Sequence, residues 1–105
     1  MPATAATFAA LGDPTRFDIV AQLSAEGPRP TMVLTAHASA SRQAISKHLR
    51  ILETAGLIRS ERLGRHRVWT LEDARLAEMR FYLSEISAQW DKALARLRLL
   101  VETEE

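Results

Sequence analysis

The stretch SRQAISKHLRILETAGLIRSERLGRHRVWTL, which runs from Ser41 to Leu71, decides the fold of this chain. Its first part predicts a helix with two faces, because a helix of about 3.6 residues per turn brings residues three and four apart onto one side. The apolar residues that share one side are Ala44, Ile45, Leu49 and Leu52. The polar residues that share the other side are Arg42, Gln43, Ser46, Lys47 and Arg50. Ser41 is the expected N-cap of this helix, and Gly56 is its expected C-cap.

The polar side of this helix carries the groups that DNA-binding helices use. Arg and Lys suit phosphate and guanine, Gln suits adenine, and Ser suits either. The stripe holds three cations, an amide and a hydroxyl, and it holds no acid. We therefore interpret it as the recognition helix of a helix-turn-helix.

The rest of the stretch predicts a basic β-hairpin. Residues 57–63 and 66–71 are the strand candidates, because Val68, Trp69 and Thr70 favour strands and Gly64 favours a hairpin turn. Seven cations and two acids lie between residues 41 and 67, although the whole chain has a net charge of +1. A basic hairpin directly after a recognition helix is a wing, which reaches phosphates or the minor groove. The alternative, that the charge run is only a solvated surface, stays open at this stage.

Three shorter helices are expected before this stretch. Residues 3–11 predict an Ala-rich helix, and Asp13 is the expected cap of a second helix that starts at Pro14 and ends at Gly27. Residues 28–30 (PRP) predict a stiff connector, and Thr31 is the expected cap of a third helix over residues 32–38. The fold class is therefore mainly α with a small β-hairpin (α+β), in the order α-α-α-α-β-β-α.

The end of the chain predicts one long helix with an apolar seam. From about residue 75, apolar residues recur at alternating spacings of three and four, as in a coiled coil. Such a helix is on the order of 40 Å long at about 1.5 Å per residue, which is long for a domain of this size. Because 47% of the 105 residues are hydrophobic, we expect a partner surface, most simply a second copy. The alternative is that the helix belongs to the core of its own domain. We expect its first half to pack there in part.

Four sequence motifs, in order, resemble those of ArsR-type (ArsR/SmtB-like) winged helix-turn-helix transcriptional regulators. Residues 11–16 (LGDPTR) resemble the opening motif of that family, and residues 44–52 (AISKHLRIL) resemble its recognition helix. Residues 55–58 (AGLI) and 64–69 (GRHRVW) resemble the following turn and the wing. The resemblance covers nearly the whole chain. It implies one winged-helix domain over residues 1–105, with the helix-turn-helix at about 32–55 and the wing at 57–71.

The resemblance also implies a homodimeric protein that binds double-stranded DNA and usually represses transcription. The residues expected to contact DNA, from the stripe and the resemblance together, are Ser41, Arg42, Gln43, Ser46, Lys47, His48, Arg50, Arg62, Arg65 and Arg67. His48 is interpreted as facing DNA, with helix packing as the alternative. In that family the first and last helices form the dimer interface, here about residues 3–11 and 75–101. The residues expected there are Phe8, Leu11, Met79, Leu83, Ile86, Trp90, Leu94, Leu97 and Leu100.

The sequence argues against several other functions. The chain has no cysteine, which excludes disulfides and the thiolate metal sites of the metal-sensing relatives. Residues 72–105 hold no histidine, and His37, His48 and His66 fall on three separate elements, so we predict no metal and no cofactor. No nucleophile elbow or glycine-rich phosphate loop is present, so we predict no enzyme. Without a signal peptide or a long apolar run, we expect a cytoplasmic protein that does not enter a membrane.

Two alternatives remain open from the sequence. Four aromatic residues would either line a pocket for a small-molecule effector of unknown identity or belong to the core: Trp69, Phe81, Tyr82 and Trp90. The chain would also serve as a protein-interaction module if the winged helix were a scaffold and the long helix bound another protein. The basic stripe and the wing cations together argue against that module, because a protein-binding surface does not need so many positive charges.

Overall fold

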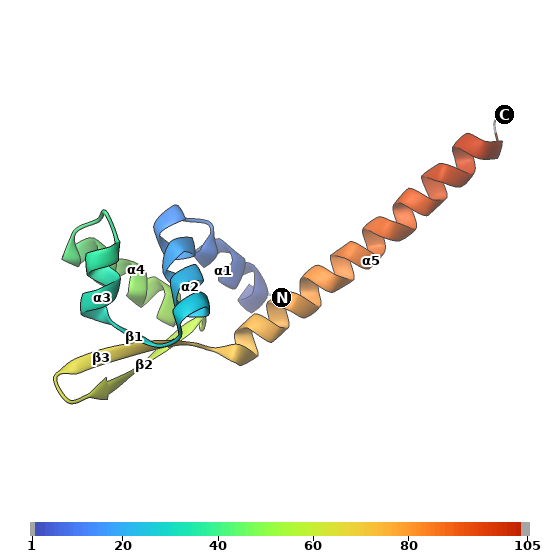
Figure 1. Cartoon of the computed structure of the whole chain (residues 1–105). Coiled ribbons are helices and arrows are strands. Elements are labelled where there is room, and N and C mark those ends of the chain that lie inside the picture. Colours follow the sequence, from blue (N-terminus) through green and yellow to red (C-terminus); the bar gives the residue numbers. More distant parts are fainter. Residues whose placement is uncertain (1, 104–105) are drawn as a thin grey trace.

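The computed structural model describes residues 2–103 of the chain and shows a winged helix with a long C-terminal helix (Figure 1). The predicted fold class is confirmed, with one added strand. The elements in order are α1 (Pro2–Leu11), α2 (Pro14–Glu26), β1 (Arg29–Pro30), α3 (Thr31–His37), α4 (Arg42–Thr54), β2 (Ile58–Leu63), β3 (His66–Leu71) and α5 (Asp73–Thr103). The helix α4 is the predicted recognition helix, and β2 and β3 are the predicted wing.

The helix ends fall where the capping residues predict them. The Asp13 carboxylate accepts a hydrogen bond from the backbone N–H of Arg16 at 3.0 Å, and Ser41 Oγ accepts one from the N–H of Ala44 at 3.2 Å. Gly27, after α2, and Gly56, after α4, both have a φ of 81°, a backbone conformation that favours glycine. These local signals therefore position the start of α2 and both ends of the recognition helix.

The prediction for Thr31 was wrong, and the connector before it was missed as a strand. The N-cap of α3 is Pro30, which offers no side-chain cap, and the Thr31 hydroxyl instead accepts a 2.8 Å hydrogen bond from Trp69 Nε1. Arg29 and Pro30 form β1, which pairs antiparallel with Trp69 and Val68 of β3. This long-range pairing has no local signal, because a strand of two residues, one of them a proline, is too short to show strand periodicity.

The three strands form a small antiparallel sheet in the order β1-β3-β2. In the wing, Ile58 lies opposite Leu71 at the base and Leu63 lies opposite His66 at the tip. Gly64 makes the turn with a φ of 64°. The base of the hairpin is buried and its tip is exposed, so the wing extends from the body at one end of the molecule (Figure 1).

The core lies between α4, the other helices of the body and the base of the sheet. The inner face of α4 supplies Ile45, Leu49 and Leu52, all fully buried, as the apolar stripe predicts. The remaining buried apolar residues come from the other elements and from the turn after α4: Ala10, Ile19, Leu23, Leu34, Leu57, Ile58, Trp69 and Met79. Burial of one face leaves the opposite face of α4 exposed to solvent.

The long helix α5 packs on the body only at its beginning and then projects away from it (Figure 1). It is 31 residues long, and the chain measures 70 × 26 × 25 Å along its principal axes. Met79, which was predicted at the dimer interface, is 6% exposed and belongs to the core, so it offers little surface to a partner. Beyond it the seam is uncovered, with Leu83, Ile86, Trp90, Leu94, Leu97 and Leu100 each 45–64% exposed. No helix in the described part is long and apolar enough to span a membrane.

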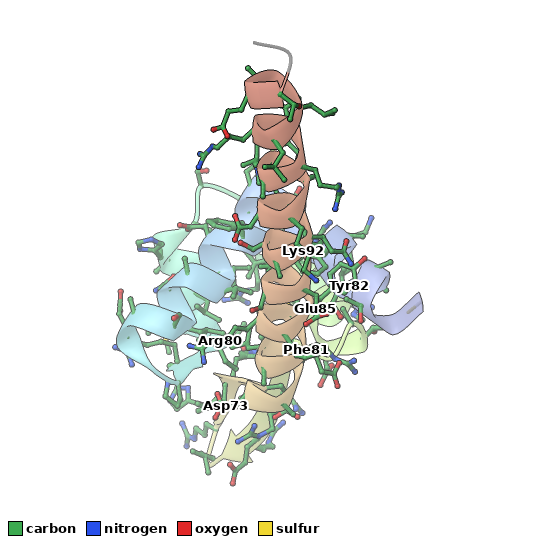
Figure 2. The ribbon with its side chains drawn as sticks, turned by 90° about the vertical axis from the view of Figure 1, so that its right-hand side faces the viewer. Asp73, Arg80, Phe81, Tyr82, Glu85 and Lys92 are labelled. Carbon is green, nitrogen blue, oxygen red and sulfur yellow. The ribbon has the colours of Figure 1, made fainter. Side chains whose placement is uncertain are left out.

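The first helix meets α5 through aromatic residues. The rings of Phe8 and Tyr82 lie 6.1 Å apart between centroids, and Tyr82 lies on the side of α5 that faces α1 (Figure 2). Phe8 and Leu11 are half-buried against the core of their own chain. Both residues were predicted at the dimer interface, and only their remaining exposed surface is available to a partner.

Candidate nucleic-acid interface

The outer face of α4 presents the predicted polar stripe. Arg42, Gln43, Lys47 and Arg50 are exposed, and Ser46 is half-buried. Ser41 lies at the start of the helix, where its oxygen caps the backbone and its hydroxyl hydrogen is still available to donate. The exposed part of this helix therefore carries cations and hydrogen-bonding groups on the side that faces away from the core.

The start of α4, the first turns of α3 and the tip of the wing enclose a basic groove. Its volume is about 450 Å³. The groove is lined by Arg42 of α4, by Thr31, Met32, Thr35 and Ala36 of α3, and by Arg62, Arg65, His66 and Arg67 of the wing and its turn. No acidic residue lines it. The fold thus brings four of the predicted DNA-contacting arginines together, one from α4 and three from the wing and its turn.

These arginines have no carboxylate partner among the described residues. Arg67 donates a 2.7 Å hydrogen bond to Ser60 Oγ across the hairpin, which fixes its side chain without neutralising it. Arg59 differs, because it forms an ion pair with Glu72 at the base of the wing. The groove therefore keeps its full positive charge, whereas Arg59 does not belong to it.

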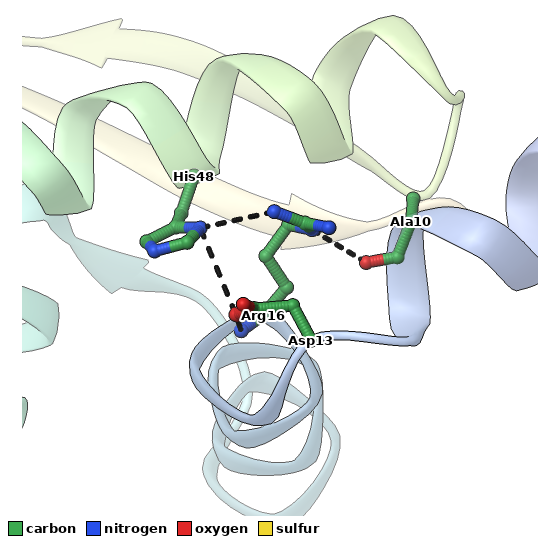
Figure 3. A network of polar contacts seen from close by, with 4 residues as sticks. All are labelled: Ala10, Asp13, Arg16 and His48. Atoms are coloured by element: carbon green, nitrogen blue, oxygen red, sulfur yellow. Dashed lines mark hydrogen bonds and ion pairs between the residues drawn. The ribbon is translucent and has the colours of Figure 1, made fainter.

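The position of His48 favours the helix-packing alternative over contact with DNA (Figure 3). Its Nδ1 atom lies 3.2 Å from Nη1 of Arg16 and 3.8 Å from the Asp13 carboxylate, and its side chain is only 20% exposed. Arg16 in turn donates from Nε to the Ala10 carbonyl at 2.6 Å. His48 thus connects the recognition helix to the start of α2, because it lies between the outer stripe and the buried face.

The same network affects the charge of Asp13. The hydrogen bond from the backbone N–H of Arg16 lowers the pKa of Asp13 below its ordinary value of 3.8. Partial burial opposes this shift, and the nearby His48 and Arg16 side chains add to it. Asp13 is therefore held as a carboxylate at the junction of α1, α2 and α4.

A second, smaller hollow of about 240 Å³ lies between α4 and the sheet. Ser46, Arg50 and Glu53 of α4 line it together with Thr31, Ser60, Arg67 and Trp69. Thr31, Thr35 and Ser60 are neighbours of the recognition helix that the sequence pattern did not predict. Alternation along β2 predicts that Ser60 and Arg62 share a face, but the approach of α3 to the wing has no local signal.

The four aromatic residues do not share a pocket. Trp69 is 6% exposed in the core, whereas Phe81 and Trp90 are more than 60% exposed on α5. Phe81 and Tyr82 line a shallow hollow beside Thr4 and Ala77, and Trp90 does not line it. The core alternative is therefore correct for Trp69, and no common effector site is formed by these residues.

The three histidines lie in separate surroundings. His37 lies 3.7 Å from Asp18, His48 contacts Asp13 and Arg16, and His66 lines the basic groove. Within residues 2–103, no group of three or more histidine, cysteine, aspartate or glutamate side chains is close enough to hold a metal ion.

Comparisons with known proteins agree with this geometry. A family described as a helix-turn-helix domain matches residues 11–61. The HTH-type transcriptional regulator Rv2034 of Mycobacterium tuberculosis is 36% identical over 95 residues, which are 90% of this chain and 85% of that protein. The HTH-type transcriptional regulator YuzN of Bacillus subtilis, described as uncharacterized, is 45% identical over 69 residues, 60% of this chain and 75% of that protein. Among solved structures, an ArsR-like transcriptional regulator from Rhodococcus sp. RHA1 superposes with a TM-score of 0.79 at 34% identity, covering 94% of this chain and 92% of that one.

Proposed function

Because this chain belongs to the ArsR family of winged helix-turn-helix transcriptional regulators, which bind DNA, we propose that it is a homodimeric repressor of a promoter. Two copies bind a roughly palindromic operator. Their recognition helices enter successive major grooves about 34 Å apart. The bound dimer occludes the promoter.

The observation that carries this proposal is the uncompensated basic surface formed by α4 and the wing. Arg42, Arg62, Arg65 and Arg67 line one groove, and no acidic residue is part of its lining. Lys47 and Arg50 continue the positive surface along α4. Cations placed in this way neutralise phosphates and supply salt-dependent affinity for any sequence, whereas Arg42, Gln43 and Ser46 face the base edges and supply the choice of sequence.

The uncovered seam of α5 supports the dimer. At about 1.5 Å per residue the helix is about 46 Å long, and most of this length has no contact with its own body. A row of large apolar side chains exposed to water along a helix marks a surface that packs on another chain. A second copy offers the same seam, so the contact is self-complementary and closes as a two-fold dimer.

The test is a fluorescence-anisotropy titration of the full chain on a pool of random duplex DNA at two salt concentrations, followed by sequencing of the bound fraction. We expect tight, salt-sensitive binding that enriches a palindrome. A variant with both Arg62 and Arg65 changed to alanine is the comparison. Both side chains are exposed, so the change should spare the core, and the loss of groove charge should weaken binding. Binding by the wild-type chain that is no tighter than that of an acidic control protein would refute the proposal.

A native mass measurement separates this function from that of a protein-interaction module. A homodimer is expected here. A stable monomer would leave the α5 seam open to a foreign protein and would favour the interaction module instead.

A further inference from the structure

A groove distinct from both the basic groove and the smaller hollow lies on the other side of the recognition helix, between α4 and α1. Its volume is about 520 Å³, larger than that of the basic groove beside the wing. Its apolar lining includes Ala9 and Ala10 of α1 and Ile51 of α4. The groove exists because α1 is rich in alanine on this side, so that no large side chain of α1 fills the space above α4.

The rim of this groove is positively charged. Arg16, Lys47 and Arg50 line it, and none of its lining residues is acidic. Lys47 and Arg50 are exposed and have no carboxylate partner among the described residues.

Arg16 is the best-positioned of the three cations. It is half-buried, and its Nε and Nη1 atoms are held by the Ala10 carbonyl and by His48 (Figure 3). Its Nη2 atom has no hydrogen-bond partner within the described part of the chain. The nearby Asp13 carboxylate balances part of its charge, but Asp13 does not line the groove. A guanidinium fixed at two nitrogens and open at the third is ordered in advance for an anion.

We propose that this groove binds a small apolar carboxylate, and that its ligand is an effector that releases the protein from DNA. The carboxylate is held by Arg16, Lys47 and Arg50, and the hydrocarbon part lies on the alanine side chains of α1 and on Ile51. Apolar walls with a few convergent polar groups are the usual composition of a small-molecule site. The absence of acid from the lining selects an anion over a neutral or cationic ligand of the same size.

The effector role rests on the proposed DNA-binding function. Lys47 and Arg50 lie on the outer stripe of α4, where phosphates are expected, and they also line this groove. A carboxylate bound between them occupies the same cations, so ligand and DNA compete. By thermodynamic linkage, DNA then weakens the binding of the ligand by the same factor.

The site is tested with octanoate as the probe, using isothermal titration calorimetry on the full chain without DNA. Octan-1-ol lacks the charge, octylamine reverses it and acetate lacks the tail, so these three are the matched ligands. We expect octanoate to bind at least about ten-fold more tightly than each of them. Equal affinity for octanoate and octan-1-ol would overturn the role of the rim cations.

The groove is located by substitution and by NMR. Ala9→Phe fills the groove and should abolish octanoate binding, whereas Ala21→Phe, at an exposed position of α2 outside the groove, should leave it unchanged. Amide shifts of the wild-type chain on adding octanoate should concentrate in residues 6–10, 16 and 47–55. This second readout keeps the proposal testable if Ala9→Phe disturbs folding or assembly. Shifts confined to other residues, or none, would overturn the site, including the case in which a second copy of the chain fills the groove.

The effector role is tested by adding octanoate to the complex with the enriched DNA. We expect the apparent affinity for DNA to fall at least about ten-fold at saturating octanoate, with no effect of octylamine. If octanoate binds without weakening the complex, the effector role is wrong and the site stands. If octanoate does not bind, the whole inference fails, while DNA binding measured without octanoate still decides the proposed function.

Discussion

The Nδ1 atom of His48, in the middle of the recognition helix, lies 3.2 Å from Nη1 of Arg16 at the start of α2. This contact joins α4 to α2 and so helps to fix the orientation of the recognition helix relative to the body. It also favours helix packing over DNA contact as the role of His48. The first prediction follows from this position.

Replacing His48 with alanine should lower stability without changing base preference. The change leaves Arg16 Nη1 without its partner, and loss of one such hydrogen bond costs about 1 kcal/mol in free energy of unfolding. Urea denaturation at fixed protein concentration measures this cost, and sequencing of the bound DNA measures preference. Lys47→Ala, one residue earlier and outward-facing, is the matched control: it should weaken DNA binding and leave stability nearly unchanged. An altered base preference in His48→Ala would show that the side chain reads DNA.

The stabilising effect of the Asp13 charge should disappear in acid. Because the pKa of Asp13 is lowered in the folded state, its charge stabilises the fold above the ordinary value of 3.8, and this contribution is lost as the pH falls through the lowered value. Asp13→Asn keeps a good N-cap but removes the charge. The difference in free energy of unfolding between wild type and Asp13→Asn should therefore be larger well above pH 3.8 and should shrink as the pH falls below 3.8.

Urea unfolding between about pH 6 and about pH 2 measures this difference. Asp91→Asn, at an exposed position of α5, is the control for the loss of one carboxylate. A difference between wild type and Asp13→Asn that grows on acidification would contradict the assigned direction of the shift.

Arg42 and Gln43 should each specify one position in the operator half-site. Replacement of either by alanine should relax preference at that position by about 1–3 kcal/mol per lost bidentate contact, because only those side chains match the donor and acceptor pattern of the base edge. Binding to a panel of single-base operator variants measures this. Weakening that is equal on every sequence would place the two residues on the phosphates instead.

Arg65 should contribute affinity that does not depend on sequence. It lies at the hairpin turn, exposed and without an ion pair among the described residues. Arg65→Ala should weaken binding to every duplex and reduce the slope of log affinity against log salt by about 1. Arg80→Ala removes the same charge from α5 (Figure 2), at a residue that does not line the groove, and should leave the slope unchanged. An unchanged slope in Arg65→Ala would remove the wing tip from the interface.

Leu97 should be required for the dimer. It is 56% exposed on the seam of α5, and Leu97→Glu would place a charge in an apolar contact between two chains. Analytical ultracentrifugation should show a monomer, and affinity for the palindrome should fall because only one half-site is held. Ala95→Glu adds the same charge about 200° around the helix and should remain dimeric. A dimeric Leu97→Glu would place the interface elsewhere.

Local sequence patterns determined most of the architecture. The stripe of Ile45, Leu49 and Leu52 fixed which face of α4 is buried, and therefore which face is left for DNA. Asp13, Gly27 and Gly56 fixed the helix ends, because capping depends on hydrogen bonds within a few residues. Gly64 and the alternation around it fixed the hairpin, and the seam fixed the length of α5.

Only the tertiary structure decided which side chains from distant segments meet. The fold places Arg42 beside the arginines of the wing, pairs Arg29 with Trp69 in a third strand, and turns His48 toward Asp13 and Arg16. The sequence left two roles open for His48 because it lies at the border of the two helix faces. Periodicity gives no direction there, and the approach of the Arg16 side chain decides its contacts. The groove between α1 and α4 likewise depends on how two helices pack, which side-chain spacing within either helix does not specify. Helix caps, turns and buried stripes depend on neighbours within a few residues, so they can be predicted from the sequence. Grooves and polar networks depend on contacts between segments far apart in the chain, so only the tertiary structure shows them.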